Sequence, residues 1–208
     1  MTRCHCCQAF ARADLEPRAA IPCTLDKLKT VLLLRNDRPL WNVSGMVEIM
    51  KSEGLRNISF AEITAATSYR DQLKMWNDAD IVVSVHGSQL TNSFFMAPHA
   101  AFIEVFMPFY NNNDLAKLAS QAQINHVKLL NDNIVSEKTV GAERPDKLQA
   151  WRHMHRTMQE YPDPVECHKH IACRKGSRQI GAIVDPSAFR NAIKQITSDI
   201  GTRQECSG

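Results

Sequence analysis

A short polar segment, residues 86–92, holds the densest group of side chains that could do chemistry. It reads HGSQLTN and therefore combines one imidazole and one glycine with several neutral hydrogen-bonding groups. Such groups can bind the oxygens of an anion or a sugar, and the imidazole can change its charge near neutral pH. The candidate ligand-binding residues of the segment are His86, Gly87, Ser88, Gln89, Leu90, Thr91 and Asn92.

Two apolar runs flank this segment and predict how it is positioned. Residues 81–85 are mostly β-branched and do not alternate with polar residues, which is typical of a strand covered on both faces in a parallel sheet. Residues 88–96 have the spacing of a short helix with Leu90 on its apolar face, and residues 101–106 form the next buried strand. The predicted unit is strand, turn, helix, strand.

In such a unit the turn lies at the carboxyl edge of the sheet, where open α/β folds bind ligands. The first N–H groups of the following helix point into that crevice and favour an anion. Gly87 lets the backbone approach a ligand closely or take a positive φ, and His86 adds a tunable hydrogen bond. Glu104, near the end of the next strand, could accept two hydrogen bonds from a ribose diol. We therefore predict a nucleoside diphosphate site.

Two arginines form a second candidate anion site. Residues 31–34 predict a buried strand, and Arg35 and Arg38 follow it directly, at the carboxyl end. Guanidinium groups there can make bidentate contacts with phosphoryl oxygens and balance the charge of a departing diphosphate. Composition alone leaves a solvated loop with surface arginines equally open.

The remaining patterns predict one α/β domain with a Rossmann-like parallel sheet flanked by helices. Further strands are expected at residues 57–63, 125–130 and 181–184, and helices at residues 44–51, 68–78, 115–123, 145–161 and 185–200. Residues 1–28 are expected to form an irregular amino-terminal arm or a truncated edge, and residues 29–204 the domain itself. Residues 131–146 are expected to form a loop.

Several side chains carry more specific expectations. Ser44 and Ser68 are the expected helix caps, and Tyr69 is expected on the buried face of the second helix. The apolar stripe of residues 145–161 is expected to pack on the sheet. Phe60 is expected in the core, although residues 60–64 could instead form a wall for a nucleotide base.

Composition excludes some classes of function. The 208 residues are 44% hydrophobic and 23% charged, with a formal net charge of +3. Lysine and arginine are scattered, so no nucleic-acid partner is expected. No apolar run approaches the roughly 20 residues of a membrane helix, and no secretory signal is visible. Because neither G-x-G-x-x-G nor G-x-x-x-x-G-K-[ST] occurs, dehydrogenases and P-loop kinases are disfavoured.

The cysteines and acidic pairs do not predict a metal site. Residues 4–7, CHCC, lack a spaced partner pair, and residues 167–173, CHKHIAC, have the wrong spacing for common zinc modules. A local disulfide between Cys167 and Cys173, or two separate thiols, is favoured over a zinc site. The pair Asp78 and Asp80 precedes a strand, at the wrong end for a nucleotide-bound metal. Neither a metal ion nor a tightly bound cofactor is therefore expected.

Residues 80–106 resemble glycosyltransferase family 61, whose members carry a segment of the form aDivvgvHGagLtN..F.ppga..iEvf. The matching positions are Asp80, His86, Gly87, Leu90, Thr91, Asn92, Phe95, Pro98, Glu104 and Phe106. The chain departs from the pattern at Ser88, Gln89 and His99. The family also has a strand that ends in arginine, a second arginine and then an asparagine, which Arg35, Arg38 and Asn42 match.

The resemblance implies one half of a GT-B glycosyltransferase, the half that binds the donor, with an amino-terminal half that this chain lacks. It implies an inverting transfer of N-acetylglucosamine or a pentose from a UDP-sugar to a hydroxyl of a glycan or glycoprotein, in the lumen of the Golgi or endoplasmic reticulum. A group outside this chain is then the expected base, and His86 is the candidate base within it. A catalytically inactive nucleotide-binding or scaffold module and a flavodoxin-like regulatory domain are the competing interpretations.

Overall fold

A five-stranded parallel sheet is the centre of the computed structural model, which describes residues 10, 13–131 and 133–202. Its strands are β1 (Lys29–Leu34), β3 (Asn57–Glu62), β4 (Ile81–Val85), β5 (Ala101–Val105) and β6 (Asn125–Leu129). They lie in the order β3-β1-β4-β5-β6, and every neighbouring pair is parallel. This is the flavodoxin-like order, whose ligand crevice lies where the strand order reverses, between β1 and β4. The predicted α/β, Rossmann-like fold is confirmed.

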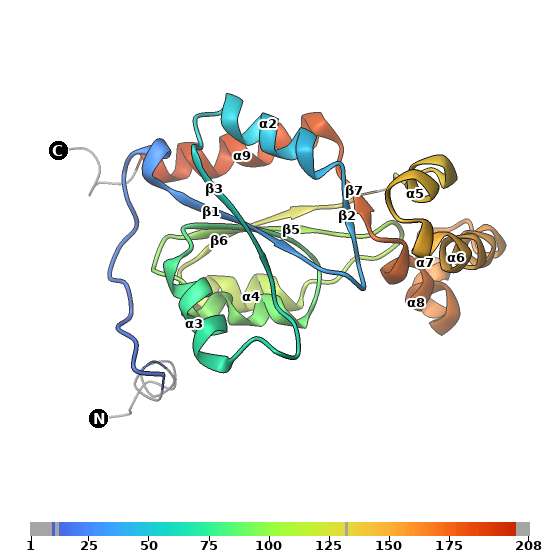
Figure 1. Ribbon diagram of the computed structural model, residues 1–208, viewed down its shortest axis with the longest axis horizontal. Coiled ribbons are helices and arrows are strands. Elements are labelled where there is room, and N and C mark those ends of the chain that lie inside the picture. The colour runs from blue at the N-terminus through green and yellow to red at the C-terminus, as the bar shows by residue number, and fades with distance from the viewer. Residues whose placement is uncertain (1–9, 11–12, 132, 203–208) are drawn as a thin grey trace.

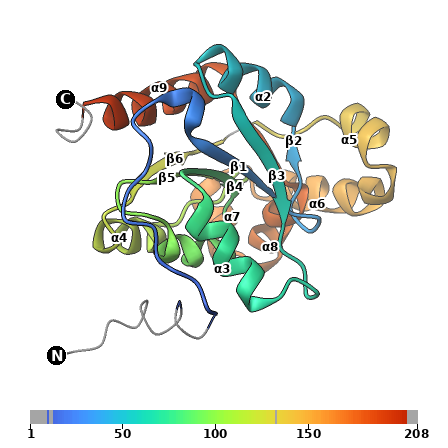
Figure 2. The ribbon, with the colours of Figure 1, turned by 60° about the vertical axis from the view of Figure 1, so that its left-hand side comes forward.

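Helices cover both faces of this sheet (Figures 1 and 2). Helices α2 (Val43–Ser52) and α9 (Pro186–Gly201) lie together on one face, and α3 (Tyr69–Asp78) and α4 (Asp114–Gln121) lie on the other. Strands β4 and β5 are buried along their whole length between these layers, as their uninterrupted apolar runs predict.

Helix boundaries follow side-chain caps at two of the predicted positions. The Ser68 hydroxyl accepts a hydrogen bond from the Asp71 N–H and begins α3, and Asp185 accepts one from the Ala188 N–H and begins α9. The expected cap at Ser44 is wrong. Helix α2 begins at Val43, and its N-cap is Asn42, whose φ of 57° lies in the left-handed region.

Two aromatic residues that were expected in the core are exposed. Phe60 is 57% exposed and Tyr69 is 55% exposed, so neither belongs to the core. Strand β3 is an edge strand with neighbours on one side only, which explains why Phe60 lies in solvent. The stripe on α3 is carried by Leu73 and Trp76, which are both buried.

A second hydrophobic core lies beyond one end of the sheet and was not predicted (Figure 1). Most of its residues come from α5 (Glu137–Glu143), α6 (Leu148–Glu160), α7 (Pro164–Lys169) and α8 (Ile171–Ile180), and η3 (Pro145–Lys147) connects α5 to α6. The stripe on α6 packs chiefly against α8 in this core, so the expectation that it packs on the sheet is wrong. The expected loop at residues 131–146 is also wrong, because α5 lies within it.

This helical group is joined to the sheet domain by a small parallel pair, β2 (Leu40–Trp41) and β7 (Ala182–Ile183). The Trp41 indole N–H donates to the Ile180 carbonyl oxygen at 2.9 Å and fixes the end of α8 beside β2. The position of α8 is therefore tied to the segment that follows Arg38.

The buried disulfide between Cys167 and Cys173 connects α7 to α8. Of the two expected states, a local disulfide or separate thiols, the structure shows the disulfide, which leaves neither thiol for a metal. Replacing both cysteines by serine is expected to lower the free energy of unfolding by about 2 kcal/mol, because the bridge closes a short loop and thereby restricts the unfolded chain. Urea titration of the double variant and of the native chain, both without reductant, measures the difference. Equal midpoints and slopes would contradict this expectation.

The segment before β1 is anchored at the amino ends of the parallel strands. Asp80 is fully buried, accepts a hydrogen bond from the Lys29 N–H at 2.8 Å and pairs with Arg18 at 2.7 Å. The Arg18 N–H donates to the Asn77 side chain at 3.0 Å. Asp80 therefore has a structural partner on each oxygen, at the amino end of β4. The cysteines at positions 4–7 lie outside the described residues.

Among the helices in the described part of the chain, none has the length and apolar character needed to cross a bilayer.

Candidate functional site

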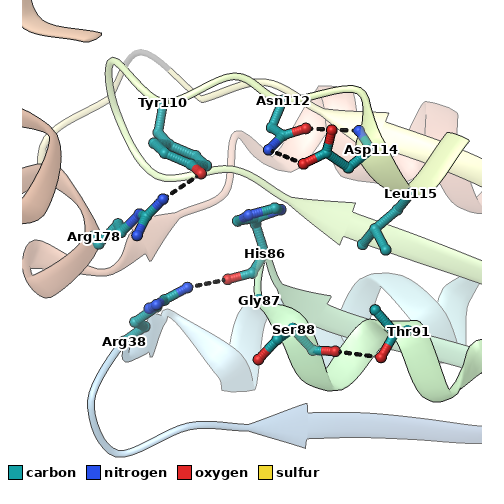
Figure 3. A pocket seen from close by; sticks show the side chains of 10 residues that line it. All are labelled: Arg38, His86, Gly87, Ser88, Thr91, Tyr110, Asn112, Asp114, Leu115 and Arg178. Carbon is teal, nitrogen blue, oxygen red and sulfur yellow. Dashed lines mark hydrogen bonds between the residues drawn. The ribbon is translucent and has the colours of Figure 1, made fainter. Parts of the chain in front are cut away.

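A hollow of about 410 Å³ opens at the carboxyl edge of the sheet (Figure 3). Its volume lies within the range of roughly 300–1,000 Å³ that is typical of small-molecule sites. The residues that line it come from the loop after β1, the turn after β4, the loop after β5, α4 and α8: Arg38, His86, Gly87, Ser88, Thr91, Tyr110, Asn112, Asp114, Leu115 and Arg178. The predicted segment thus forms one wall, and α8 forms another.

Gly87 is required for space and not for a special backbone conformation. Its φ of 175° is extended, which any residue adopts, so the predicted alternative of a positive φ is wrong. A Cβ added to Gly87 would lie 2.0 Å from Arg35 Nη1 and 3.4 Å from Arg38 Nη1. The glycine therefore allows two guanidinium groups to approach the backbone of the turn.

The helix after the turn, η2 (Ser88–Phe95), is a 3-10 helix of the predicted extent. Its first N–H groups have no acceptor within the helix and lie beside the hollow, where they can bind an anion. Leu90 is fully buried and anchors the helix in the core, so it supports the site without touching the ligand space. Thr91 donates to the Ser88 carbonyl oxygen at 2.7 Å and lines the hollow.

Arg38 is held at the centre of the site. Its Nη1 donates to the His86 carbonyl oxygen at 2.8 Å, and its side chain is 19% exposed (Figure 3). Burial, together with the charges of Arg35 and Arg178, lowers the pKa of Arg38. Cations that crowd one another in this way favour a bound anion.

Arg35 lies beside Gly87 and lines an adjacent hollow of about 360 Å³. It makes a two-bond contact with Asp37 at 2.9 and 2.8 Å, and this contact lowers the pKa of the Asp37 carboxyl. The adjacent hollow is lined by Arg35, Asn36, Asp37, Glu62, Ile63, Thr64, Gln89 and Lys147. The residues 88–92 therefore divide between two hollows, with Ser88 in the first and Gln89 in the second.

Two predicted residues lie away from these hollows. Asn42 lines a separate hollow with Gly45, Pro186 and Arg190, because the chain has turned through β2 before it reaches α2. Asn92 is half-buried on η2 and lines neither the first hollow nor the second. The structure does not bring Asn42 together with Arg35 and Arg38.

Glu104 has a different role from the one predicted. It is 1% exposed, and its two carboxylate oxygens are engaged by His86 Nδ1 at 2.5 Å and His126 Nε2 at 2.8 Å. Both oxygens are occupied below the floor of the hollow, so Glu104 cannot bind a ribose diol. Burial opposes its ionisation, but the hydrogen bonds from His126 and His86 outweigh it and lower the pKa of Glu104.

Arg178 and Tyr110 complete the hollow and were missed by the sequence reasoning. Arg178, on α8, donates to the Tyr110 hydroxyl at 2.5 Å, and its guanidinium carbon lies 4.6 Å from the centre of that ring. The loop of residues 111–113 also contributes to the hollow. Asn112 lines it and also bonds to Asp114.

The family model of glycosyltransferase 61 matches residues 1–103, about half of the chain. The chain belongs to glycosyltransferase family 61. The matched residues include Arg35, Arg38 and the whole polar segment at 86–92. No curated protein matches the chain.

In this family 61 glycosyltransferase, the match to the family model ends at residue 103, before two residues that complete the hollow. Tyr110 and Arg178 both follow residue 103, and Arg178 comes from the helical group beyond the sheet. No group of three or more His, Cys, Asp or Glu side chains within the described ranges is arranged to hold a metal ion. Positive charge in the hollow comes from arginine.

Proposed function

We propose that this family 61 glycosyltransferase transfers a sugar from a UDP-sugar to a hydroxyl of a glycan or glycoprotein, and that the first hollow binds the diphosphate. One observation carries the proposal. Arg38, from the loop after β1, and Arg178, from α8, line the same hollow as the amino end of η2. Three sources of positive potential from distant parts of the chain therefore face one space, at the point where the strand order reverses.

The proposed reaction inverts the anomeric carbon. The acceptor oxygen forms a bond to that carbon while the bond to the β-phosphate oxygen breaks, and the electron pair stays on the departing UDP. The proton of the acceptor hydroxyl passes to a general base. Arg38, Arg178 and the N–H groups of η2 stabilise the charge on the departing diphosphate, a task that a divalent cation performs in other transferases. We therefore propose transfer without a metal.

The second hollow is the proposed place of the nucleoside. Ser88 lines the diphosphate hollow and the next residue, Gln89, lines the second hollow, so the two hollows adjoin at this turn. Glu62, the last residue of β3, lines it and offers an exposed carboxylate, and Ile63 and Thr64 lie beside it. Glu62 replaces Glu104 as the proposed contact of the ribose diol. Ile63 and Thr64, which belong to the segment 60–64 considered as a wall for a base, are the part of it proposed to contact the base.

The sugar and the cell compartment follow from the same family resemblance. N-acetylglucosamine or a pentose is the proposed sugar, and the lumen of the Golgi or endoplasmic reticulum is the proposed location. The buried disulfide between Cys167 and Cys173 supports a lumenal location, since disulfides persist in oxidising compartments.

Calorimetric titration with UDP and with uridine tests the proposal. UDP is expected to bind more tightly than uridine, and Arg178→Ala is expected to weaken UDP binding by about tenfold, the loss of one charge-assisted hydrogen bond. Uridine binding should change little. Arg152→Ala is the matched control, because Arg152 is an exposed arginine on α6 that pairs with Glu137. Absence of UDP binding, or equal affinities for UDP and uridine, would contradict the proposed diphosphate site.

A further inference from the structure

A buried carboxylate connects two histidines beneath the diphosphate hollow. His86 Nδ1 and His126 Nε2 each contact a different oxygen of Glu104, at 2.5 and 2.8 Å. The Glu104 side chain is 1% exposed, and those of His126 and His86 are 7% and 12% exposed. Glu104 has a lowered pKa and is therefore ionised at neutral pH. Each imidazole therefore donates an N–H hydrogen bond to this carboxylate.

The orientation of His86 follows from these contacts. Its ring stacks on Phe106 with the ring centres 5.0 Å apart, and Tyr110 lies 4.9 Å away. Because Nδ1 is engaged by Glu104, Nε2 is the nitrogen that a ligand in the hollow can reach. His126 stacks on Phe102 at 4.4 Å, which holds Glu104 from the far side. Rotation of either imidazole would break a buried hydrogen bond.

The charged groups around His86 act in opposite directions. The buried carboxylate of Glu104 places a negative charge beside Nδ1, whereas Arg38 and Arg178 place positive charges around the hollow. A bound diphosphate cancels the effect of those cations. The titratable and charged groups that face His86 or its partners are Arg38, Glu104, Tyr110, Asp114, His126, Lys128 and Arg178.

From this arrangement we propose that His86 binds the diphosphate as an imidazolium, with Nε2–H donating to a phosphoryl oxygen. Glu104 and His126 are positioning residues that hold Nδ1–H and stabilise the positive charge. The inference rests on the proposed diphosphate site and adds a protonated histidine to the groups that bind the diphosphate. It also assigns His86 a role other than that of general base, which would require an unprotonated Nε2.

Proton uptake on binding is the direct test. UDP is titrated calorimetrically between pH 7.5 and 8.5 in buffers of different ionisation enthalpy. The terminal phosphate of UDP, whose pKa is about 6, is then already ionised. The native chain is expected to take up a proton as it binds UDP, and its affinity is expected to fall by up to about tenfold for each pH unit of increase.

Three variants separate the roles of the residues. His86→Gln keeps a side-chain amide but cannot be protonated, so its binding should show no proton uptake and little dependence on pH. Glu104→Gln should move the fall in affinity to lower pH. His126→Gln retains a hydrogen-bond donor to Glu104, so its UDP affinity should depend on pH as in the native chain. His126→Phe removes the donor and should change this dependence. A purely structural role would change stability in these variants without changing the pH profile.

The possible results distinguish this inference from the proposed function. Failure of UDP to bind the native chain overturns both. UDP binding without proton uptake, or with the same uptake in His86→Gln, overturns the role of His86 and leaves the diphosphate site intact. Thermal unfolding of each variant shows whether it is folded at the temperature of the titration.

Discussion

Replacing Arg38 by alanine is expected to weaken UDP binding by about 100-fold. Arg38 faces the diphosphate hollow and also donates to the His86 carbonyl oxygen at 2.8 Å. The variant therefore loses a charge-assisted contact with the ligand, worth about 1.5–3 kcal/mol, and a bond that positions the turn. Each 1.4 kcal/mol corresponds to about tenfold in affinity. Calorimetric titration with UDP at fixed ionic strength provides the measurement.

Two further variants test this explanation. Arg38→Lys keeps the charge but cannot reach both a phosphoryl oxygen and the carbonyl oxygen with a planar fork, so it should recover only part of the lost affinity. The double variant Arg38→Ala with Arg178→Ala should lose less than the sum of the two single losses, because the two cations act on one anion. Losses that simply add would indicate that the arginines serve independent sites.

Gly87→Ala is expected to weaken UDP binding by at least about tenfold while the fold is retained. The added Cβ would lie 2.0 Å from Arg35 Nη1, so the guanidinium must move away from the turn. Movement of a flexible side chain costs the fold little, and the extended backbone at φ 175° accepts alanine. The ligand, however, loses both the approach to the turn and the arginine beside it. Titration with UDP and thermal unfolding of the same sample separate the two effects.

Two other glycines provide controls. Gly201 lies at the end of α9 with nothing within 4 Å of an added Cβ, so Gly201→Ala should change neither UDP binding nor stability appreciably. Gly181 has φ +81°, and an added Cβ would lie 2.1 Å from the Pro39 carbonyl oxygen. Gly181→Ala should therefore destabilise the fold. A large fall in melting temperature for Gly87→Ala, as for Gly181→Ala, would show that Gly87 serves the fold instead of the site.

The central part of the site could be predicted because its signals are local. The buried run before His86, the turn and the amphipathic segment after it all lie within about twenty residues, and each pattern favours one kind of element. Arg35 and Arg38 follow a buried strand directly, and parallel strands end at one edge, so their meeting with Gly87 follows from topology. The family-specific pattern lies in this same stretch.

The role of Glu104 could not be predicted in the same way. Its position near the end of a buried strand is visible in the sequence, but its partners depend on which strand lies beside it. The pairing of β5 with β6 places His126 within reach of one oxygen, and the turn after β4 places His86 at the other. A buried carboxylate must find donors, and only the packed structure shows which donors they are.

Local patterns in the sequence were enough to predict the five strands of the central sheet, the turn after β4 and the arginines at one sheet edge, since apolar periodicity and chain direction act over short distances. The tertiary structure alone decided that α8 closes the site. Arg178 reaches Tyr110 because α6 and α8 form their own core around a disulfide and β7 ties that core to β2. Such long-range contacts depend on the complementary shapes of packed surfaces, which no spacing of residues along the chain encodes.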